Sequence, residues 1–503
     1  MRPCRLAYRS ALLMALGGTL ADSALAVEWI GNPGIVASVS TIYTDNVCQS
    51  SENQRGQWLG GVGLSTAPSG SIQGRGSRSE FNLGGSIQVN TLNSQLNDDE
   101  CAGEFDGDND QFAPNLYATG SATLVDNLLK VNVNGRAAQN EVSPYRGAGG
   151  DPYAGNGNNN TFYRYSISPV LNRRLKNTST ANLQYTYDEI LNSSDAVSDS
   201  TSDAVVATLT NDKSSQISWQ WRANYRRIQY SDPDFVLVNT GNNRVVLPRE
   251  DTELKSAGLN MGYRIDRRWQ LTGTYGWEWN DYQTYNNANT GGNAWRFGVN
   301  WTPSARTSVS LGMGDRFFGK TPDLNISHTR KRSVFTASYK KDITFARDIR
   351  TEDNLVNPDF GFNSSLNTQS AIIEERFNLG YTYSGRHAIL SASGNYSDQL
   401  QEDNGETSVY RGFAVTVSPM ISSVYTLSGT IAWSEDEPEG FFGVSNIGPS
   451  TPAESWTTTV QVGRQLSERM NLSLGYQYID QQSDDSFNGY QENRVRATVD
   501  YSL

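Results

Sequence analysis

The chain of 503 residues has only two histidines and three cysteines, and 19% of its residues are charged. Its longest apolar run, residues 11–21, is shorter than the roughly 20 residues that a membrane-spanning helix needs. No linker rich in proline, serine or charge divides the chain into separate soluble domains. The missing apolar runs exclude a bundle of membrane helices, and the missing linkers favour one large, repetitive architecture.

Aromatic and glycine residues are plentiful. The sequence contains 25 Tyr, 17 Phe, 11 Trp and 46 Gly, which is too much aromatic surface for a chain that stays unfolded. Glycine suits turns, whereas tyrosine, tryptophan and phenylalanine suit pleated strands. The formal net charge of -12 argues against nucleic acid as a partner, because phosphate binding requires clustered Lys and Arg.

The N-terminus has the three parts of a secretion signal. Arg2, Arg5 and Arg9 precede the short apolar run, and Ala24-Leu25-Ala26 forms a small-residue cleavage site. We therefore predict a signal peptide at residues 1–26 and a single mature domain at residues 27–503. The alternative is an uncleaved anchor helix.

After residue 27, long segments alternate apolar and polar residues and then break at Gly, Asn, Asp or Pro. From Trp269 onward, for example, Trp269, Tyr275 and Trp277 share one face of a strand, and Thr272 and Glu278 share the other. These segments run ten or more residues with aromatics near their ends, whereas strands of a soluble β-sandwich are shorter. The pattern favours an all-β fold, a transmembrane antiparallel up-and-down barrel, over a soluble sandwich.

Short and long connections alternate along the chain. Short turns are predicted near residues 125–127, 211–214, 266–268, 302–305, 330–332, 384–386, 418–422 and 466–469, with longer polar connections between them. Dividing the segment 325–350 at Arg330-Lys331-Arg332 gives about 22 strands (20–24), an even number as bacterial barrels require. We expect short periplasmic turns, long external loops and a place in the outer membrane of a Gram-negative bacterium. The expected partners are then outer-membrane lipid, lipopolysaccharide and the barrel-assembly machinery.

The two histidines offer little for catalysis. His328 and His387 both fall beside predicted periplasmic turns, away from an external active site. General acid–base chemistry needs a partner within hydrogen-bond reach, and interfacial histidine is the simpler interpretation. We predict that the protein is not an enzyme.

Two cysteines remain after loss of the signal peptide. Cys48 and Cys101 each follow the outer end of an odd-numbered strand, the first and the third. In an oxidising compartment this placement predicts a disulfide between the first two long loops. The alternative is a pair of free thiols.

One loop is strongly acidic, with Asp106, Asp108 and Asp110 at every second position. Crowded carboxylate oxygens suit Ca²⁺, although the segment lacks the complete EF-hand pattern. A solvated acidic loop is the other interpretation, and no other cofactor is expected.

The polar phase of the strands places a group of cations inside the barrel. They are Lys130, Arg136, Arg164, Arg222, Arg226, Arg264, Arg296, Arg376, Arg494 and Arg496, against Asp188, Glu278, Glu374 and Asp500. Rings of Arg and Lys bias a pore toward anions. The alternative is a network of charges that only stiffens the wall.

One region resembles a known family. The runs RFFGKT at residues 316–321, SHTRKRS at 327–333 and SYKKDIT at 338–344 are similar to the outer-membrane β-barrel family associated with the PEP-CTERM/exosortase system. The resemblance implies a barrel that works near exopolysaccharide production and export. It implies no catalytic residues.

Two functions follow from these observations. The first is a wide, porin-like channel or conduit linked to the export or passage of exopolysaccharide or anionic solutes, with the polysaccharide or its export components as partners. The second is a non-conducting structural barrel whose external loops bind surface polymer or protein. The strand pattern leaves open whether loops fold into the lumen.

Overall fold

A computed structural model of the chain describes residues 28–503 with gaps. The residues outside the description are 31–33, 52–53, 67–71, 77, 91–111, 143–157, 176–177, 195–196, 212–215, 232–235, 241–242, 248–250, 285–288, 352–370, 404, 440–451 and 484–488. No helix within the described part of the chain is long and apolar enough to cross a membrane.

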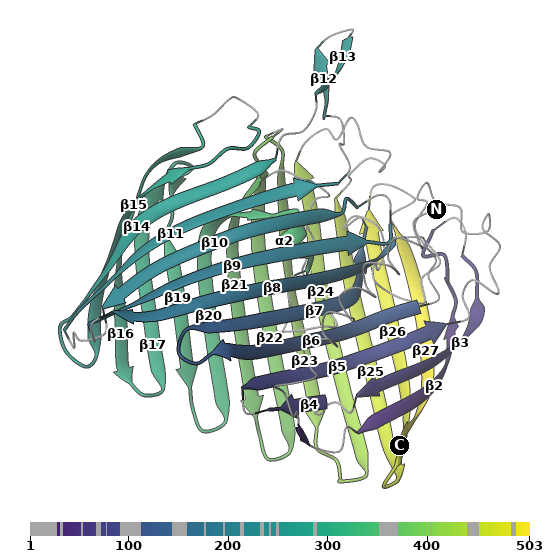
Figure 1. Ribbon diagram of the computed structural model, residues 1–503. Coiled ribbons are helices and arrows are strands. Elements are labelled where there is room, and N and C mark those ends of the chain that lie inside the picture. The colour runs from purple at the N-terminus through teal and green to yellow at the C-terminus, as the bar shows by residue number, and fades with distance from the viewer. Residues whose placement is uncertain are drawn as a thin grey trace.

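The fold is a closed antiparallel barrel of 22 strands (Figure 1). Its first nine strands are β2 (Ile35–Thr44), β3 (Gln57–Thr66), β5 (Ser79–Asn90), β6 (Phe112–Val125), β7 (Leu129–Glu141), β8 (Asn159–Leu175), β9 (Ser179–Asn192), β10 (Ser200–Asn211) and β11 (Ile217–Tyr230). The next seven are β14 (Thr252–Arg264), β15 (Trp269–Trp279), β16 (Gly291–Ser304), β17 (Thr307–Arg316), β19 (Asp323–Thr329), β20 (Ser333–Phe345) and β21 (Ala371–Ser384). The last six are β22 (Ala388–Gln401), β23 (Thr407–Pro419), β24 (Tyr425–Glu439), β25 (Ala453–Ser467), β26 (Met470–Ser483) and β27 (Tyr490–Ser502).

The ring closes where the last strand pairs with the first. β27 and β2 run antiparallel from Val36 opposite Ser502 to Thr44 opposite Arg494. This pairing leaves no free edge among these strands, as a membrane barrel requires. The predicted fold class and strand number are confirmed, including the division at residues 330–332 between β19 and β20.

Six smaller elements complete the fold. β1 (Glu28–Ile30) pairs with β4 (Ile72–Arg75), and β4 continues along β5 where β3 ends. β18 (Gly319–Lys320) lies in the hairpin between β17 and β19, and β12 (Val236–Thr240) with β13 (Asn243–Leu247) forms a hairpin beyond the barrel (Figure 1). The sixth element is a short helix, α2 (Ala346–Thr351).

The change of partner on β5 occurs at a glycine. Gly85 has a φ of +124°, and a Cβ there would lie 2.0 Å from the carbonyl oxygen of Asn115. The hydroxyl of Thr66, the last residue of β3, accepts a hydrogen bond from the Gly85 N–H at 3.1 Å. Only glycine fits this bend, and it carries β5 from β3 to β4.

The outer surface of the barrel is apolar, with aromatic residues toward both ends of the strands. One belt lies toward the end with the long connections and includes Trp58, Trp277, Trp279, Trp295 and Trp456. The other lies toward the short turns and includes Tyr263, Trp269, Trp301, Tyr383, Tyr425 and Tyr501. Trp269 and Trp301 face each other on β15 and β16, with ring centroids 5.4 Å apart. Such girdles mark the two interfaces of a membrane.

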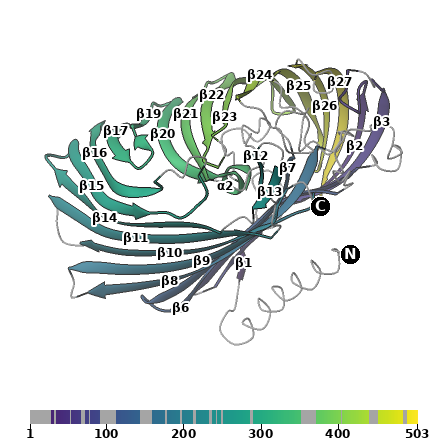
Figure 2. The same cartoon turned by 90° about the horizontal axis from the view of Figure 1, so that it is seen from above.

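Seen from above, the ring is flattened, and α2 lies inside it (Figure 2). The helix follows β20 directly, at the end of the barrel that carries the long connections. We call this end the outer end and the opposite one the short-turn end. One connection therefore folds into the lumen, which the strand pattern had left open.

Candidate functional site: an arginine-lined lumen crossed by a helix

The candidate site is the lumen itself. All ten predicted lumen cations lie on the phase of their strands opposite the exposed apolar residues; for example, Arg296 alternates with the exposed Trp295 and Phe297. Six of them lie in the outer half of the barrel and have hydrogen-bond acceptors, namely Arg136, Arg164, Arg226, Arg296, Arg376 and Arg494. The lumen therefore has two regions with different electrostatics.

Helix α2 occupies the outer region. Five of its six residues are buried, including Arg347, Ile349 and Arg350. A six-residue helix is too short to be stable alone, so tertiary contacts must hold it in place. Those contacts come from β7, β8, β9 and β11, on the wall that faces β20 across the flattened ring (Figure 2). We call α2 and its contacts the lumen bridge.

Ion pairs form the first set of contacts in the lumen bridge. Arg226 on β11 donates two hydrogen bonds to the Asp348 carboxylate, at 2.7 and 2.9 Å. Arg347 pairs with Asp188 on β9, which also accepts a bond of 2.8 Å from Arg164 on β8. Bidentate and shared charge-assisted bonds are strong and directional, so they fix the helix against this wall.

The second set of contacts provides hydrogen-bond donors for the backbone carbonyls at the C-terminal end of the helix. Arg136 donates to the Thr351 carbonyl at 3.3 Å, and Asn140 donates to the Arg350 carbonyl at 3.2 Å. In return, Arg350 donates to the carbonyl of Val142 at 2.5 Å. These carbonyls have no partner within a helix this short, and wall residues replace the missing turn.

An apolar cluster joins the two walls beside the helix. Phe345 is 1% exposed and packs with Ile228 of β11, Tyr282 and Ala371. The Arg226 guanidinium lies 5.5 Å from the centre of the Phe345 ring, in addition to its pairing with Asp348. Apolar burial and charge therefore hold the same point of the bridge.

The ionisation of Asp348 is linked to the bridge. Burial alone raises the pKa of its carboxyl, but the charge and hydrogen bonds of Arg226, together with the charges of Arg347 and Arg164, outweigh burial and hold that pKa below its ordinary value. Asp348 is therefore a carboxylate at neutral pH, and the bridge is stable in that state.

The other cations of the outer region pair within the wall. Arg296 pairs with Asp323, Arg376 with Glu374 at 2.9 Å, and Arg494 with Glu492 at 2.7 Å. Arg316 joins Glu278 at 2.8 Å and also Asp342. These contacts create a stiff network around the outer half of the lumen.

Sequence reasoning missed several members of these networks, namely Arg316, Asp323, Asp342, Arg347, Asp348, Arg350 and Glu492. Strand phase could have placed Asp323, Asp342, Arg316 and Glu492, because each lies an even number of residues from an inward neighbour on its strand. No period could have placed the α2 residues, since they lie in a connection.

The remaining four predicted lumen cations are exposed to the lumen. Lys130, Arg222 and Arg264 lie on the inward phase toward the short-turn end, and Arg496 lies on β27. Arg222 donates to Asn224 at 2.9 Å and Arg496 donates to Thr498 at 3.2 Å, which are neutral acceptors. Asp500, the remaining predicted lumen acid, is half-buried on β27.

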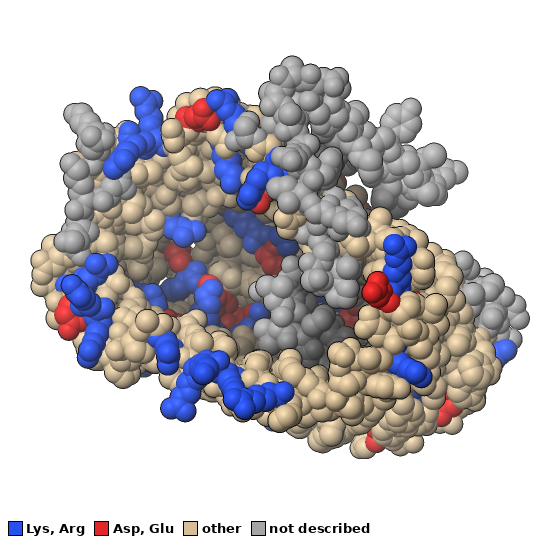
Figure 3. Space-filling view, turned by 90° about the horizontal axis from the view of Figure 1, so that it is seen from below, with Lys and Arg blue, Asp and Glu red and all other residues tan. Residues whose placement is uncertain are grey.

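Further cations surround the short-turn mouth. They are Arg267, Arg268, Arg306, Arg330, Lys331, Arg332, Arg386 and Arg469, all exposed, and the acidic residues on these turns are Asp266 and Glu468. Asp126, on the turn between β6 and β7, pairs with Arg78. Figure 3 shows this end of the barrel, with Lys and Arg around its edge and charged residues of both signs in the hollow. The short-turn mouth is therefore basic, although the chain carries a net charge of -12.

The predicted disulfide, the predicted calcium ligands and the histidines are not part of the lumen site described above. Cys48 is disulfide-bonded, while its predicted partner Cys101 and the predicted calcium ligands Asp106, Asp108 and Asp110 lie outside the described residues. The described residues contain no group of three metal-ligating side chains. His328 lies near the short-turn end, with Nδ1 2.8 Å from the hydroxyl of Thr307, and its placement agrees with the sequence prediction.

No protein-family model and no curated protein matches the chain. Several solved structures share its fold. The siderophore receptor PirA from Acinetobacter baumannii aligns with a TM-score of 0.50 and 9% identity, over 94% of this chain and 81% of that one. The FrpB iron transporter from Neisseria meningitidis aligns with a TM-score of 0.50 and 11% identity, over 94% of this chain and 83% of that one. At such low identity the likeness establishes the fold.

The fold and lumen together define the class. A closed 22-stranded barrel with an apolar exterior, two aromatic belts and a polar interior is an outer-membrane β-barrel. The protein therefore resides in the outer membrane of a Gram-negative bacterium. In such barrels the short turns face the periplasm, which places the basic mouth on the periplasmic side.

Proposed function

We propose that the protein is a gated conduit for anionic solutes, with acidic exopolysaccharide as its substrate. The observation that carries this proposal is the set of exposed inward cations, Lys130, Arg222 and Arg264, between a basic mouth and the lumen bridge. Inward cations without an ion pair attract anions, whereas cations already paired with carboxylates do so far less.

The lumen bridge acts as the gate. It joins two facing walls through residues of one connection, so its release widens the lumen without breaking a barrel strand. Nε and Nη1 of both Arg347 and Arg350 are buried and have no hydrogen-bond partner among the described residues. Incompletely satisfied buried groups raise the free energy of the closed state and make release easier.

The link to exopolysaccharide rests on the family resemblance of residues 316–344. In this barrel Arg316 of that region pairs with Asp342 on the lumen side, and Lys341 pairs with Glu375 at 2.7 Å on the outward phase of β20 and β21. We infer that the substrate is a carboxylated polysaccharide and that the partners include its export components. The proposed activity is transport, with no catalytic step.

A second candidate is the closed barrel that binds surface polymer through its outer loops. The buried lumen bridge favours it, because a bridge that never opens leaves no pathway for large solutes. In that case the basic mouth and the exposed lumen cations serve no transport role.

Planar-bilayer recording separates the two candidates. The mature barrel is compared with a variant in which residues 346–370 are replaced by a short Gly-Ser turn. This replacement is sterically reasonable because Phe345 and Ala371 lie directly opposite each other across β20 and β21. The folded state of both proteins is checked by heat-modifiable gel mobility.

A gated anion conduit predicts low conductance for the intact barrel and several-fold higher, anion-selective conductance for the shortened variant. An acidic oligosaccharide added on the short-turn side should block that current. If neither folded barrel conducts, or if the shortened variant prefers cations, the conduit proposal is wrong, and the closed-barrel function takes its place.

A further inference from the structure

A cavity of about 500 Å³ lies at the short-turn mouth, away from the lumen bridge. It is formed by the turn between β14 and β15, the turn between β16 and β17, and the end of β19. Two of its lining residues, Ser308 on β17 and Ser327 on β19, lie directly opposite each other across the two strands. Both side chains have the inward phase. The cavity, which we call the mouth pocket, therefore includes part of the lumen face of the wall.

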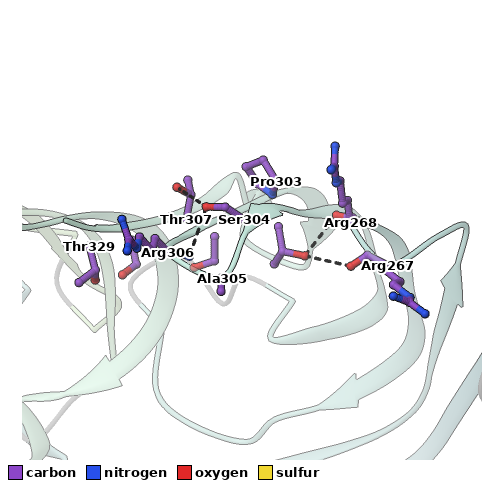
Figure 4. Close-up of a pocket in the computed structure, with 11 residues that line it drawn as sticks. Arg267, Arg268, Pro303, Ser304, Ala305, Arg306, Thr307 and Thr329 are labelled. Carbon is purple, nitrogen blue, oxygen red and sulfur yellow. Dashed lines mark hydrogen bonds between the residues drawn. The ribbon is translucent and has the colours of Figure 1, made fainter. Parts of the chain in front are cut away.

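The charge of the mouth pocket is of one sign. Arg267 and Arg268 flank it on one side and Arg306 on the other, and all three side chains are exposed (Figure 4). No acidic residue lines it. The neighbouring Asp266 accepts hydrogen bonds from the N–H groups of Arg268 and Trp269, at 2.6 and 2.8 Å, and so shapes the arginine turn.

Hydroxyl groups make up much of the remaining lining. Ser304 donates to the Thr307 hydroxyl at 3.3 Å and accepts from the Arg306 N–H at 3.2 Å, which orders this turn (Figure 4). Thr302 donates to the carbonyls of Arg267 and Arg268, both at 3.4 Å, and ties the two turns together. The arginines are therefore mounted on turns that are held in register before a ligand arrives.

This lining selects a chemical class. Guanidinium groups bind carboxylates with two parallel hydrogen bonds, and serine and threonine hydroxyls match the hydroxyls of a sugar ring. Pro303 and Ala305 are the only apolar residues in the lining, so an apolar ligand gains little there. The lining includes both strand phases: Ser308 and Ser327 have the inward phase, whereas Thr307 shares the phase of the exposed Leu311. A lipid headgroup is therefore the competing ligand that the binding test must separate from a sugar.

We propose that the mouth pocket is a binding site for uronic-acid units, and that it captures an acidic polysaccharide chain as it enters the lumen from the periplasm. Arg267, Arg268 and Arg306 hold the sugar carboxylates, and the hydroxyl wall holds the ring. The cations Arg264 and Arg222 lie further inside the lumen, so a captured chain passes them one after the other as it moves inward. This site would define the substrate class of the proposed conduit, and its biological role rests on that proposed function.

Equilibrium binding tests the site without any ion flow. Trigalacturonate is titrated into the purified, folded barrel in detergent by calorimetry, beside the uncharged maltotriose and inorganic phosphate. The test variant is Arg267→Gln/Arg268→Gln/Arg306→Gln. The matched control is Arg330→Gln/Lys331→Gln/Arg332→Gln, which removes the same charge from the same rim outside the pocket lining.

We expect trigalacturonate affinity to fall at least tenfold in the test variant and to stay within about twofold in the control. Equal losses in the two variants would mean that rim charge alone attracts the ligand, which overturns the site. Equal binding of maltotriose, or displacement of trigalacturonate by equimolar phosphate, overturns the uronic-acid assignment. Nanodiscs rich in phosphatidylglycerol that abolish binding would assign the arginines to lipid instead.

The two proposals fail separately. A barrel that conducts anions but binds trigalacturonate equally well in both variants keeps the conduit and loses the mouth pocket. A barrel that never conducts but shows pocket-dependent binding keeps the site and loses the conduit.

Discussion

The two ends of the lumen differ in whether their positive side chains are paired with carboxylates. In the outer half, arginines are matched by carboxylates and by the backbone of α2, and Glu492 there is completely buried. At the short-turn end, the cations are exposed and mostly lack a carboxylate partner in the described structure, as Arg264 and Arg306 illustrate. Paired charge builds a rigid constriction, whereas unpaired charge builds an attractive surface. The same residue type therefore has a structural role at one end and a recognition role at the other.

Removing a buried carboxylate from the outer network should have the largest effect. Glu492 accepts hydrogen bonds from Thr44 at 2.6 Å and Gln49 at 3.1 Å and pairs with Arg494. Glu492→Ala removes the carboxylate of a buried ion pair beside the strands that close the barrel, which should lower the free energy of unfolding by roughly 3–5 kcal/mol. Urea titration of tryptophan fluorescence in lipid vesicles measures it.

The control for Glu492→Ala is Asp126→Ala at the short-turn end. Asp126 pairs with Arg78 at 2.6 Å, and the two side chains are 58% and 53% exposed. Its removal should cost no more than about 1 kcal/mol, because solvent screens the pair. Equal losses for the two variants would contradict the difference between the two ends.

Loosening the lumen bridge should have the next largest effect, on conductance and not on folding. Asp348→Ala removes the acceptor of two hydrogen bonds from Arg226 while leaving every barrel strand unchanged. We expect single-channel conductance to rise several-fold. Asp323→Ala, which breaks the pair with Arg296 inside the wall, should leave conductance within about twofold, and an equal rise in both would remove the gating role of α2.

Acid should open the bridge in the wild-type barrel. Because the pKa of Asp348 is lowered in the folded protein, its contribution is complete above the ordinary carboxyl pKa of about 3.9 and is lost as pH falls through the lower folded-state value. Conductance should therefore stay constant from about pH 7 to about pH 4 and rise below that. The Asp348→Asn barrel should conduct more at neutral pH and respond little to acid; a wild-type rise centred near neutral pH would implicate another group.

Neutralising an exposed lumen cation should have the smallest effect on stability and a clear effect on selectivity. Lys130→Gln/Arg264→Gln should change the free energy of unfolding by less than about 0.5 kcal/mol per site, since neither side chain has an ion pair in the described structure. In the bridge-shortened barrel, the reversal potential in a KCl gradient should shift toward cation permeability. No shift would show that these cations do not face the permeation pathway.

Much of the fold could be predicted because a strand's period is local. Alternation of residues such as Trp269, Tyr275 and Trp277 fixes which face meets lipid, and the short turns fix the strand order. The same period placed Arg164 and Arg226 inside the barrel. It could not show that both would bind a connection more than a hundred residues away, since nothing local in α2 marks its partner.

The mouth pocket shows the same limit at the other end of the barrel. Arg267, Arg268 and Arg306 each follow from the sequence as turn residues near a membrane interface. Their grouping with the hydroxyls of β17 and β19 depends on how neighbouring hairpins align at the rim. A turn's own sequence carries no information about that alignment.

The sequence by itself determined a barrel of about 22 strands, its lipid face and its inward cations, because a period of two residues assigns each side chain to a face. Only the tertiary structure decided which of those cations are neutralised. Ion pairing depends on distances across a closed ring, and the ring brings β11 and α2 together at 2.7 Å although they are 122 residues apart in the chain. The paired, constricted outer half and the open, basic mouth are therefore properties of barrel closure.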